Sequence, residues 1–179
     1  MLTAAQRTAA LLNALAGPRP DPAEVAGVLL AHGETGPLGL TARDVDGLRA
    51  AAGLLRPVFA AGDTDEAAEL LNGLLREHTG PLRLTSHGGG SPWHPHLDPD
   101  DDSPWDTWFL ASSCMALAVL VWDRQRPPGG ICASVSCEHV FLAQGSGPER
   151  RYCSRRCATR ERVAAHRRAR SGAGPDTPA

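Results

Sequence analysis

The chain of 179 residues contains no lysine, so all of its basic charge comes from 18 arginines, and only 4% of its residues are aromatic. Ala, Gly, Pro and Arg are abundant, which indicates a compositional bias, so arginine in place of lysine carries little functional information. The scarcity of aromatic residues is more informative. Tyr152 is the one aromatic residue near the most basic stretch, and base stacking on single strands needs such side chains, so single-strand recognition is disfavoured.

Long apolar runs and known catalytic motifs are also missing. The uncharged run between Asp106 and Asp123 has sixteen residues, whereas a membrane-spanning helix needs about twenty. The first residues contain no basic segment that leads into an apolar run, so we expect a cytoplasmic protein without a membrane partner. Because there is no Gly-rich phosphate loop, no His-Glu-x-x-His and no zinc-deaminase signature, we expect that the chain is not an enzyme.

Four of the five cysteines form two short pairs. Four residues separate Cys132 from Cys137, three separate Cys153 from Cys157, and fifteen lie between the pairs. This spacing predicts one tetrahedral Zn²⁺, and four thiolates leave no open position for water, so the ion would be structural. Two disulfides or unrelated buried thiols are the alternatives, and a reducing compartment disfavours the first. Metal binding would supply folding free energy to a segment with few large apolar residues.

The residues after the second pair predict a basic helix. From Ser154 to Arg170 there is no Gly or Pro, and Ser154 can cap the helix start. At 100° per residue, small residues fall beside Cys157 and the basic residues fall on the other face. The candidate nucleic-acid contacts on that face are Arg155, Arg156, Arg160, Arg162, Arg167 and Arg170.

The charge is distributed unevenly along the chain. Residues 1–130 carry nine arginines and sixteen acids, whereas residues 131–179 carry nine arginines and four acids. A helix with one-sided positive charge repels itself unless something negative lies along it, and arginine's planar fork matches phosphate oxygens. The preferred hypothesis is therefore a DNA-binding regulator in which this helix docks on the duplex.

Other interpretations remain open. A run of charged residues most often belongs to a helix that is simply exposed to solvent. The segment could also be a zinc-structured module that binds RNA or an acidic protein surface. A zinc-thiolate redox sensor is a third alternative. Arg150, Arg151, Arg155 and Arg156 lie next to the thiolates and would keep them deprotonated and oxidisable.

The C-terminal segment resembles a known family. The residues that carry the likeness are Cys132-x4-Cys137, Val140-Phe141, the run Arg150 to Ser154, and Cys157-Ala158-Thr159-Arg160 followed by a basic helix. This pattern is similar to the CGNR-type zinc finger. There are two departures: the tetrapeptide Cys-Gly-Asn-Arg that names the family is Cys-Ala-Thr-Arg here, and the second cysteine pair is spaced by three residues instead of four.

The resemblance extends in layout to the N-terminal part. In bacterial proteins the CGNR finger follows a mostly helical ABATE domain, a name given to proposed stress-induced transcription regulators. The resemblance implies that Cys132, Cys137, Cys153 and Cys157 bind zinc and that the finger binds DNA. It carries no role over to the positions of the altered Gly-Asn pair.

Periodicity in the first 126 residues predicts a mainly α fold. Helical spacing is found in residues 2–16, 22–32, 41–60 and 64–79, with capping signals at Asp21 and Thr41, and the most apolar helix spans Trp105 to Arg124. Residues 82–85 and 91–97 flank three glycines and predict one small β-hairpin. We expect Cys114 to be a small buried hydrophobe in the central helix.

These patterns divide the chain into four parts. Residues 1–126 form the ABATE-like helical domain, 127–130 a linker, 131–170 the zinc finger with a short β-knuckle and a basic helix, and 171–179 a disordered tail. A homodimer is possible, and the sequence does not identify a small-molecule effector of the helical domain.

One further cluster of polar residues is found on the predicted hairpin. His94 and His96 would point the same way from its second strand, with His87 and several aspartates nearby. A second metal or ligand site is a minority hypothesis here, because histidines beside a glycine turn are more often solvated.

Overall fold

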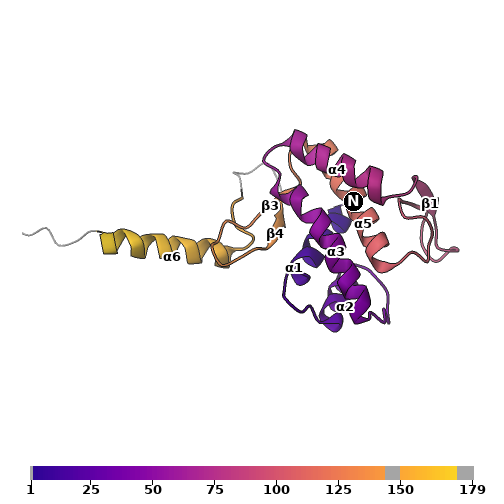
Figure 1. Ribbon diagram of the computed structural model, residues 1–179, viewed down its shortest axis with the longest axis horizontal. Coiled ribbons are helices and arrows are strands. Elements are labelled where there is room, and N and C mark those ends of the chain that lie inside the picture. The colour runs from indigo at the N-terminus through magenta and orange to yellow at the C-terminus, as the bar shows by residue number, and fades with distance from the viewer. Residues whose placement is uncertain (1, 144–149, 173–179) are drawn as a thin grey trace, which may run out of the picture.

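The computed structural model describes residues 2–143 and 150–172, which form six α-helices and two small antiparallel hairpins (Figure 1). The predicted mainly α fold is therefore confirmed. Five helices pack into one body, and the sixth extends away from it. Their bounds are α1 (Leu2–Ala14), α2 (Pro22–Ala31), α3 (Ala42–Ala60), α4 (Thr64–His78), α5 (Trp105–Arg124) and α6 (Arg155–Gly172).

The helix starts follow the capping signals of the sequence. The Asp21 carboxylate accepts a hydrogen bond from the Ala23 backbone N–H at 3.0 Å and caps α2. At the start of α3, the Thr41 hydroxyl accepts from the Asp44 N–H, and the Asp44 carboxylate accepts from the Thr41 N–H. Such a capping box satisfies two backbone donors that the first helical turn leaves without partners.

Helix α5 forms the centre of the body. It contacts α1, α3 and α4, and its apolar side chains, including Phe109 and Leu117, are fully buried. By length and composition alone α5 could cross a membrane, and it is the one such helix among the described residues. Because half of its most apolar window is buried in the protein, α5 is better explained as the central helix of the core.

The first hairpin lies beside one end of α5. Strands β1 (Arg83–Thr85) and β2 (His94–His96) pair antiparallel, with Arg83 opposite His96 and Thr85 opposite His94. The connecting turn uses Gly88 and Gly89 at positive φ, which glycine adopts without steric cost. This hairpin was predicted from the sequence and is confirmed.

The second hairpin joins the cysteine-rich segment to the helical body. Strands β3 (Gly129–Ile131) and β4 (Val140–Leu142) pair antiparallel, and all three residues of β4 are buried. Val140 and Leu142 belong to the same apolar core as the helices. The Asn13 side chain of α1 donates to the Val140 carbonyl at 3.1 Å and accepts from its N–H at 2.8 Å.

Gly129 and Gly130, the last two residues of the predicted 127–130 linker, lie in strand β3 and not in an irregular connection. A Cβ added at Gly129 would lie 1.9 Å from the Phe141 carbonyl oxygen and 3.0 Å from a ring carbon of Phe59. Only glycine allows the two strands and α3 to approach this closely, and composition alone did not distinguish such a site from a flexible link.

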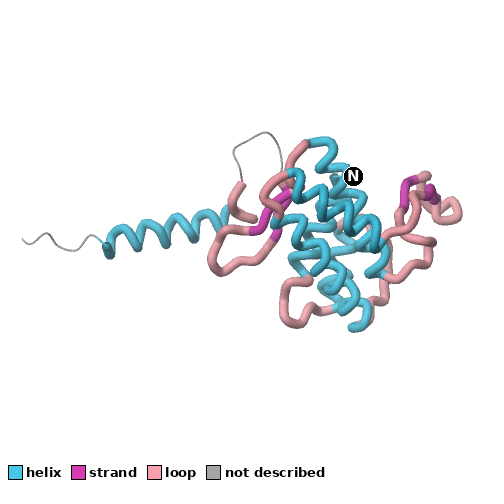
Figure 2. Tube along the Cα trace, turned by 45° about the horizontal axis from the view of Figure 1, so that its top comes forward, coloured by secondary structure: helices cyan, strands magenta, loops and turns pink. Residues whose placement is uncertain are grey.

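Helix α6 projects from the finger away from the five-helix body (Figures 1 and 2). It forms no broad contact with another helix or strand in the part of the chain that the structure describes. The helix continues to Gly172, so Ser171 and Gly172, the first two residues of the predicted 171–179 tail, are helical. Residues 173–179 lie outside the described residues.

Candidate metal centre and basic helix

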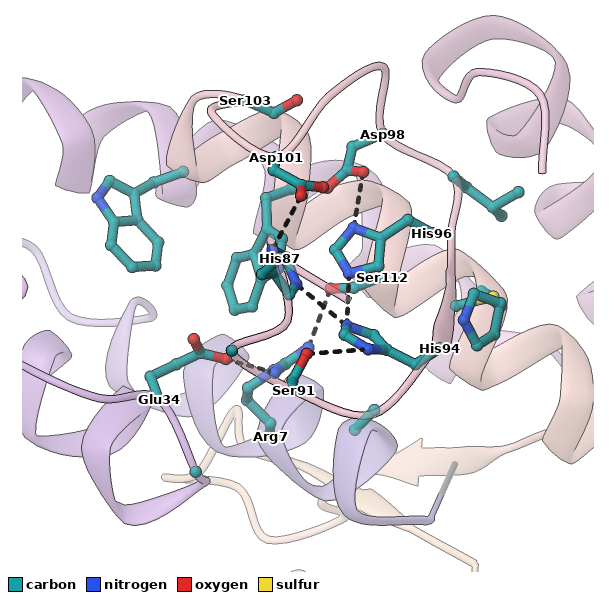
Figure 3. Close-up of a pocket in the computed structure, with 18 of the residues that line it drawn as sticks. Arg7, Glu34, His87, Ser91, His94, His96, Asp98, Asp101, Ser103 and Ser112 are labelled. Carbon is teal, nitrogen blue, oxygen red and sulfur yellow. Dashed lines mark hydrogen bonds and ion pairs between the residues drawn. The ribbon is translucent and has the colours of Figure 1, made fainter. Parts of the chain in front are cut away.

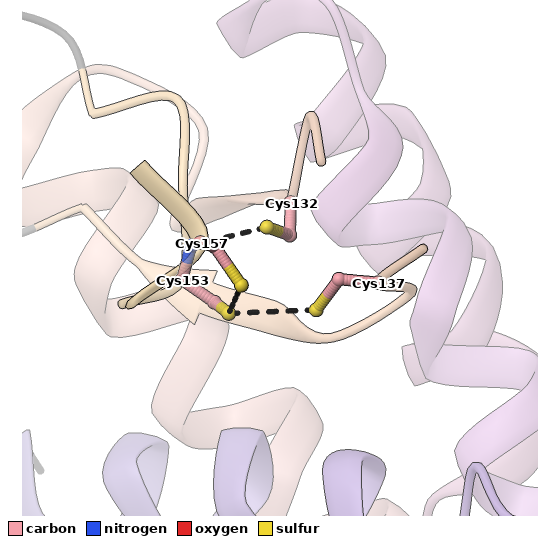
Figure 4. Close-up of side chains that lie close together, drawn as sticks. All are labelled: Cys132, Cys137, Cys153 and Cys157. Carbon is pink, nitrogen blue, oxygen red and sulfur yellow. Dashed lines mark hydrogen bonds between the residues drawn. The ribbon is translucent and has the colours of Figure 1, made fainter. Parts of the chain in front are cut away.

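Separate backbone elements bring the four cysteines together (Figure 4). Cys132 follows β3, Cys137 lies in the turn before β4, Cys153 precedes α6, and Cys157 lies in the first turn of α6. The Cys132 N–H donates to the His139 carbonyl at 2.8 Å, and the Cys137 N–H donates to the Ser134 carbonyl at 2.9 Å. These bonds close the knuckle formed by residues 132–137.

The sulfur separations fit a metal centre and not disulfides. Cys153 Sγ lies 3.6 Å from Cys137 Sγ and 3.7 Å from Cys157 Sγ, and all four sulfurs lie within 4.8 Å of one another. A disulfide needs about 2.0 Å between sulfurs. Four thiolates at about 2.3 Å from zinc form a tetrahedron with edges of about 3.8 Å. The set is therefore arranged for one structural Zn²⁺, as the sequence predicted, and the disulfide alternative is excluded.

Donors around the sulfurs support the thiolate form. The Cys153 N–H points at Cys132 Sγ at 3.4 Å, and Arg160 Nη2 lies 3.4 Å from Cys157 Sγ. The pKa of Cys157 is lowered to about 7, mainly by a hydrogen bond with Ser154. Burial raises the pKa of Cys153 to about 12, so this thiol must release a proton when it binds zinc at neutral pH.

The buried Ser134 hydroxyl connects the knuckle to α6. It donates to the Glu161 carboxylate at 2.6 Å and accepts from Arg160 Nη2 at 2.7 Å. Glu161 also accepts from the Val135 N–H at 3.3 Å. The side of α6 that carries Arg160 and Glu161 is thus fixed to the metal-binding knuckle over its first two turns. No spacing rule in the sequence identifies Ser134 or Glu161.

The predicted arginines lie along the exposed surface of α6. All six are exposed to solvent. Arg160 differs from the others because its Nε and Nη2 both contact Ser134. It therefore supports the finger structurally, and this contact competes with any role on DNA. The remaining members of the set are Arg155, Arg156, Arg162, Arg167 and Arg170.

The structure also places the two histidines of the hairpin together. His94 Nε2 lies 3.0 Å from His96 Nε2, and His87 Nε2 lies 3.1 Å from His94 Nε2. The sequence indicated His87 only as a neighbour, because its place within the cluster depends on the left-handed turn that follows β1. These histidines are separate from the cysteine centre.

Cys114 is not part of the four-cysteine metal centre. It is fully buried in α5, and burial raises the pKa of its thiol to about 12. A protonated thiol in an apolar core is a small hydrophobe and a poor nucleophile, as predicted.

Comparisons with known proteins agree with this geometry. Residues 130–170 match the family model described as the CGNR zinc finger. A search of curated proteins found no match for the chain. The matched segment contains the four cysteines and most of α6, whereas the ABATE-like character of residues 1–126 stays a prediction. Residues 130–170 therefore match the CGNR zinc finger, carry four cysteines arranged for one Zn²⁺, and are attached to a helical body.

Proposed function

We propose that this protein binds duplex DNA through the arginine face of α6 and acts as a zinc-dependent regulator of transcription. The observation that carries the proposal is that α6 extends from the finger (Figure 2) and that its arginines are exposed to solvent. From Arg162 to Arg170 every residue is exposed except the half-buried Ala164. An isolated α-helix of this kind fits the major groove of B-DNA.

The dimensions of α6 suit this role. Its 18 residues extend about 27 Å at 1.5 Å per residue. Arg155, Arg162 and Arg170 lie on one side of the helix over most of that length, and Arg156 lies on the adjacent part of the same face. The guanidinium groups can therefore contact several phosphates in succession. The apolar residues of the helix after Val163 are all alanines, which offer little area for packing against a protein.

The zinc centre holds α6 in place for this contact. The hydrogen bonds of Ser134 with Arg160 and Glu161 fix the first turns to the knuckle, and β4 fixes the knuckle to the body. Helix placement by a metal-bound loop reduces the conformational entropy lost on binding. Stress-related regulation rests on the resemblance of the helical body alone and belongs to the same proposal.

Fluorescence anisotropy with a random-sequence duplex and the zinc-loaded full chain tests the proposal. If about five phosphates are neutralised, log K should fall with log salt at a slope of about −4 to −5. Replacement of Arg156 or Arg162 by Ala should weaken binding and bring the slope about one unit closer to zero. Arg76→Ala, an exposed arginine on α4, is the matched control and should leave affinity unchanged.

Two results would contradict DNA binding. One is no change in anisotropy at low salt. The other is equal losses in the Arg76 and Arg162 variants, which would indicate only a general effect of net charge. Preference for duplex RNA or an acidic protein in the same assay would assign the arginine face to one of the alternative partners.

A further inference from the structure

Three imidazole rings converge on one point at the mouth of a pocket (Figure 3). His94 occupies the middle, with its Nε2 3.0 Å from His96 Nε2 and 3.1 Å from His87 Nε2. One ring nitrogen from each residue lies within 4.8 Å of the others. The cluster is formed entirely by the β1–β2 hairpin and shares no residue with the zinc finger.

Acceptors on the far side of each ring determine where the ring protons lie. His94 Nδ1 is 2.7 Å from the Pro92 carbonyl oxygen, and His96 Nδ1 is 2.8 Å from Asp98 Oδ1. His87 Nδ1 lies 3.4 Å from an Asp101 carboxylate oxygen. Carbonyl and carboxylate oxygens cannot donate, so Nδ1 carries the hydrogen in the neutral rings of His94 and His96. The Nε2 atom of each of these two rings then presents a lone pair.

The lone pairs on His94 Nε2 and His96 Nε2 face each other at 3.0 Å and repel, because neither nitrogen has a hydrogen to share. A cation between them removes that repulsion. Imidazole nitrogens are preferred ligands of Zn²⁺, Cu²⁺, Ni²⁺ and Fe²⁺. At zinc–nitrogen distances of about 2.0–2.1 Å, tetrahedral ligands lie about 3.3 Å apart. The observed separations of 3.0 and 3.1 Å need only a small outward movement of the rings.

The surroundings also resemble those of a built metal site. Asp98 is 3% exposed and accepts from Arg83 Nη2 at 2.7 Å. Asp101 accepts from Arg83 Nη1 and from the Thr85 hydroxyl, each at 2.7 Å. Arg83 Nη2 also lies 3.5 Å from His96 Nδ1, but the shorter Asp98 contact determines the tautomer. Carboxylates that orient ligand histidines in this way increase metal affinity.

We infer that His87, His94 and His96 form a second metal site that takes a divalent transition metal of the zinc class. Three protein ligands leave a coordination position open, in contrast to the closed cysteine centre. The cluster borders a cavity of about 760 Å³ that is also lined by Arg7, Trp105 and Trp108. The open position is therefore accessible to water or to a small exogenous ligand. This inference is independent of DNA binding.

Metal stoichiometry in the full chain tests the site. Protein stripped by a chelator under reducing conditions is equilibrated with a small excess of Zn²⁺, passed through a desalting column and analysed by inductively coupled plasma mass spectrometry. The wild-type chain should retain two zinc ions. A single zinc ion in the wild-type chain, with no second binding event in a calorimetric titration, would overturn the inference and indicate that a shared proton holds the rings together.

Variants assign the second ion to the histidines. His94→Ala and His96→Gln should each retain one zinc ion, whereas the control His78→Ala, an exposed histidine in α4, should retain two. After Co²⁺ substitution, the thiolate-to-metal charge-transfer absorption should persist in all three variants. This absorption is the control that the cysteine centre still forms. Two ions in the His94 variant would refute the assignment.

A spectroscopic measurement needs no substitution. Zinc added beyond the first equivalent should shift the imidazole resonances of His87, His94 and His96 in the wild-type chain and leave that of His78 unchanged. Shifts confined to other residues would contradict the site. Duplex affinity should be equal in the wild-type chain and in His94→Ala, so failure of this inference and failure of DNA binding are distinguishable.

Discussion

At the scale of single residues, two positions determine how the finger and the body are built. Gly129 permits β3 to lie against both Phe141 and Phe59, and Asp44 completes the capping box of α3. Gly129 permits this packing because it has no side chain, and Asp44 caps the helix through its carboxylate. Both effects are local, and each can be measured by a single substitution.

Gly129→Ala should lower the free energy of unfolding by about 3 kcal/mol, because the added methyl group meets backbone that cannot rotate away. Urea denaturation of the zinc-loaded chain measures this change. Gly53→Ala in α3 is the control, since nothing lies within 4 Å of its added Cβ. That variant should gain about 0.5–1 kcal/mol from helix propensity. Equal stability of the Gly129 variant and the wild type would contradict the packing of β3.

Asp44→Asn should reduce the dependence of stability on acidity. Hydrogen bonds from Thr41 lower the pKa of Asp44 below its ordinary 3.8. A carboxyl group whose pKa is lower in the folded state stabilises the fold at pH values above its unfolded-state pKa. This stabilisation is lost as the pH falls through its folded-state pKa. Thermal unfolding at pH 6 and pH 3 should therefore show a smaller difference for the variant than for the wild type. An equal difference would mean that the capping box does not form.

At the scale of elements, the finger consists of two differently supported parts. The β3–β4 hairpin is held by Asn13 and by the apolar core, whereas α6 makes no broad contact with another helix or strand in the described part of the chain and is attached mainly through the zinc centre. An isolated helix of this length is marginal in water, and like charges along one face destabilise it further.

Removal of zinc by a chelator should therefore unfold α6 and leave the hairpin folded. Hydrogen–deuterium exchange should become fast in residues 155–170 after chelation and stay slow in β4 and α5. Zinc added back should restore protection. Slow exchange in α6 without metal would show that the helix does not depend on the zinc centre.

The elements also show how far sequence reasoning extends. The helix starts were predicted correctly from the capping residues Asp21 and Thr41, and the central helix from the apolar run of α5. Capping and periodicity are local signals, so the sequence alone reveals them. The cysteine spacing likewise predicted the metal ligands. Gly129 and the position of His87 were not predictable, because a close strand contact and a left-handed turn depend on residues distant in sequence.

At the scale of the whole molecule, an acidic helical body carries a basic helix beyond the β3–β4 hairpin. The acids of residues 1–130 outnumber their arginines by seven, whereas the arginines of residues 131–179 outnumber their acids by five. Phosphate backbone is attracted to one end of such a molecule and repelled by the other, so binding should be oriented as well as salt-dependent.

The most direct test of the account is the affinity for one random duplex before and after removal of the zinc bound by the cysteine centre, measured by anisotropy at low salt. Binding should weaken at least tenfold when the metal is removed, because α6 loses its fixed conformation, and should recover when zinc is restored. Unchanged affinity in metal-free protein would contradict the claim that the zinc centre presents the arginine helix to DNA.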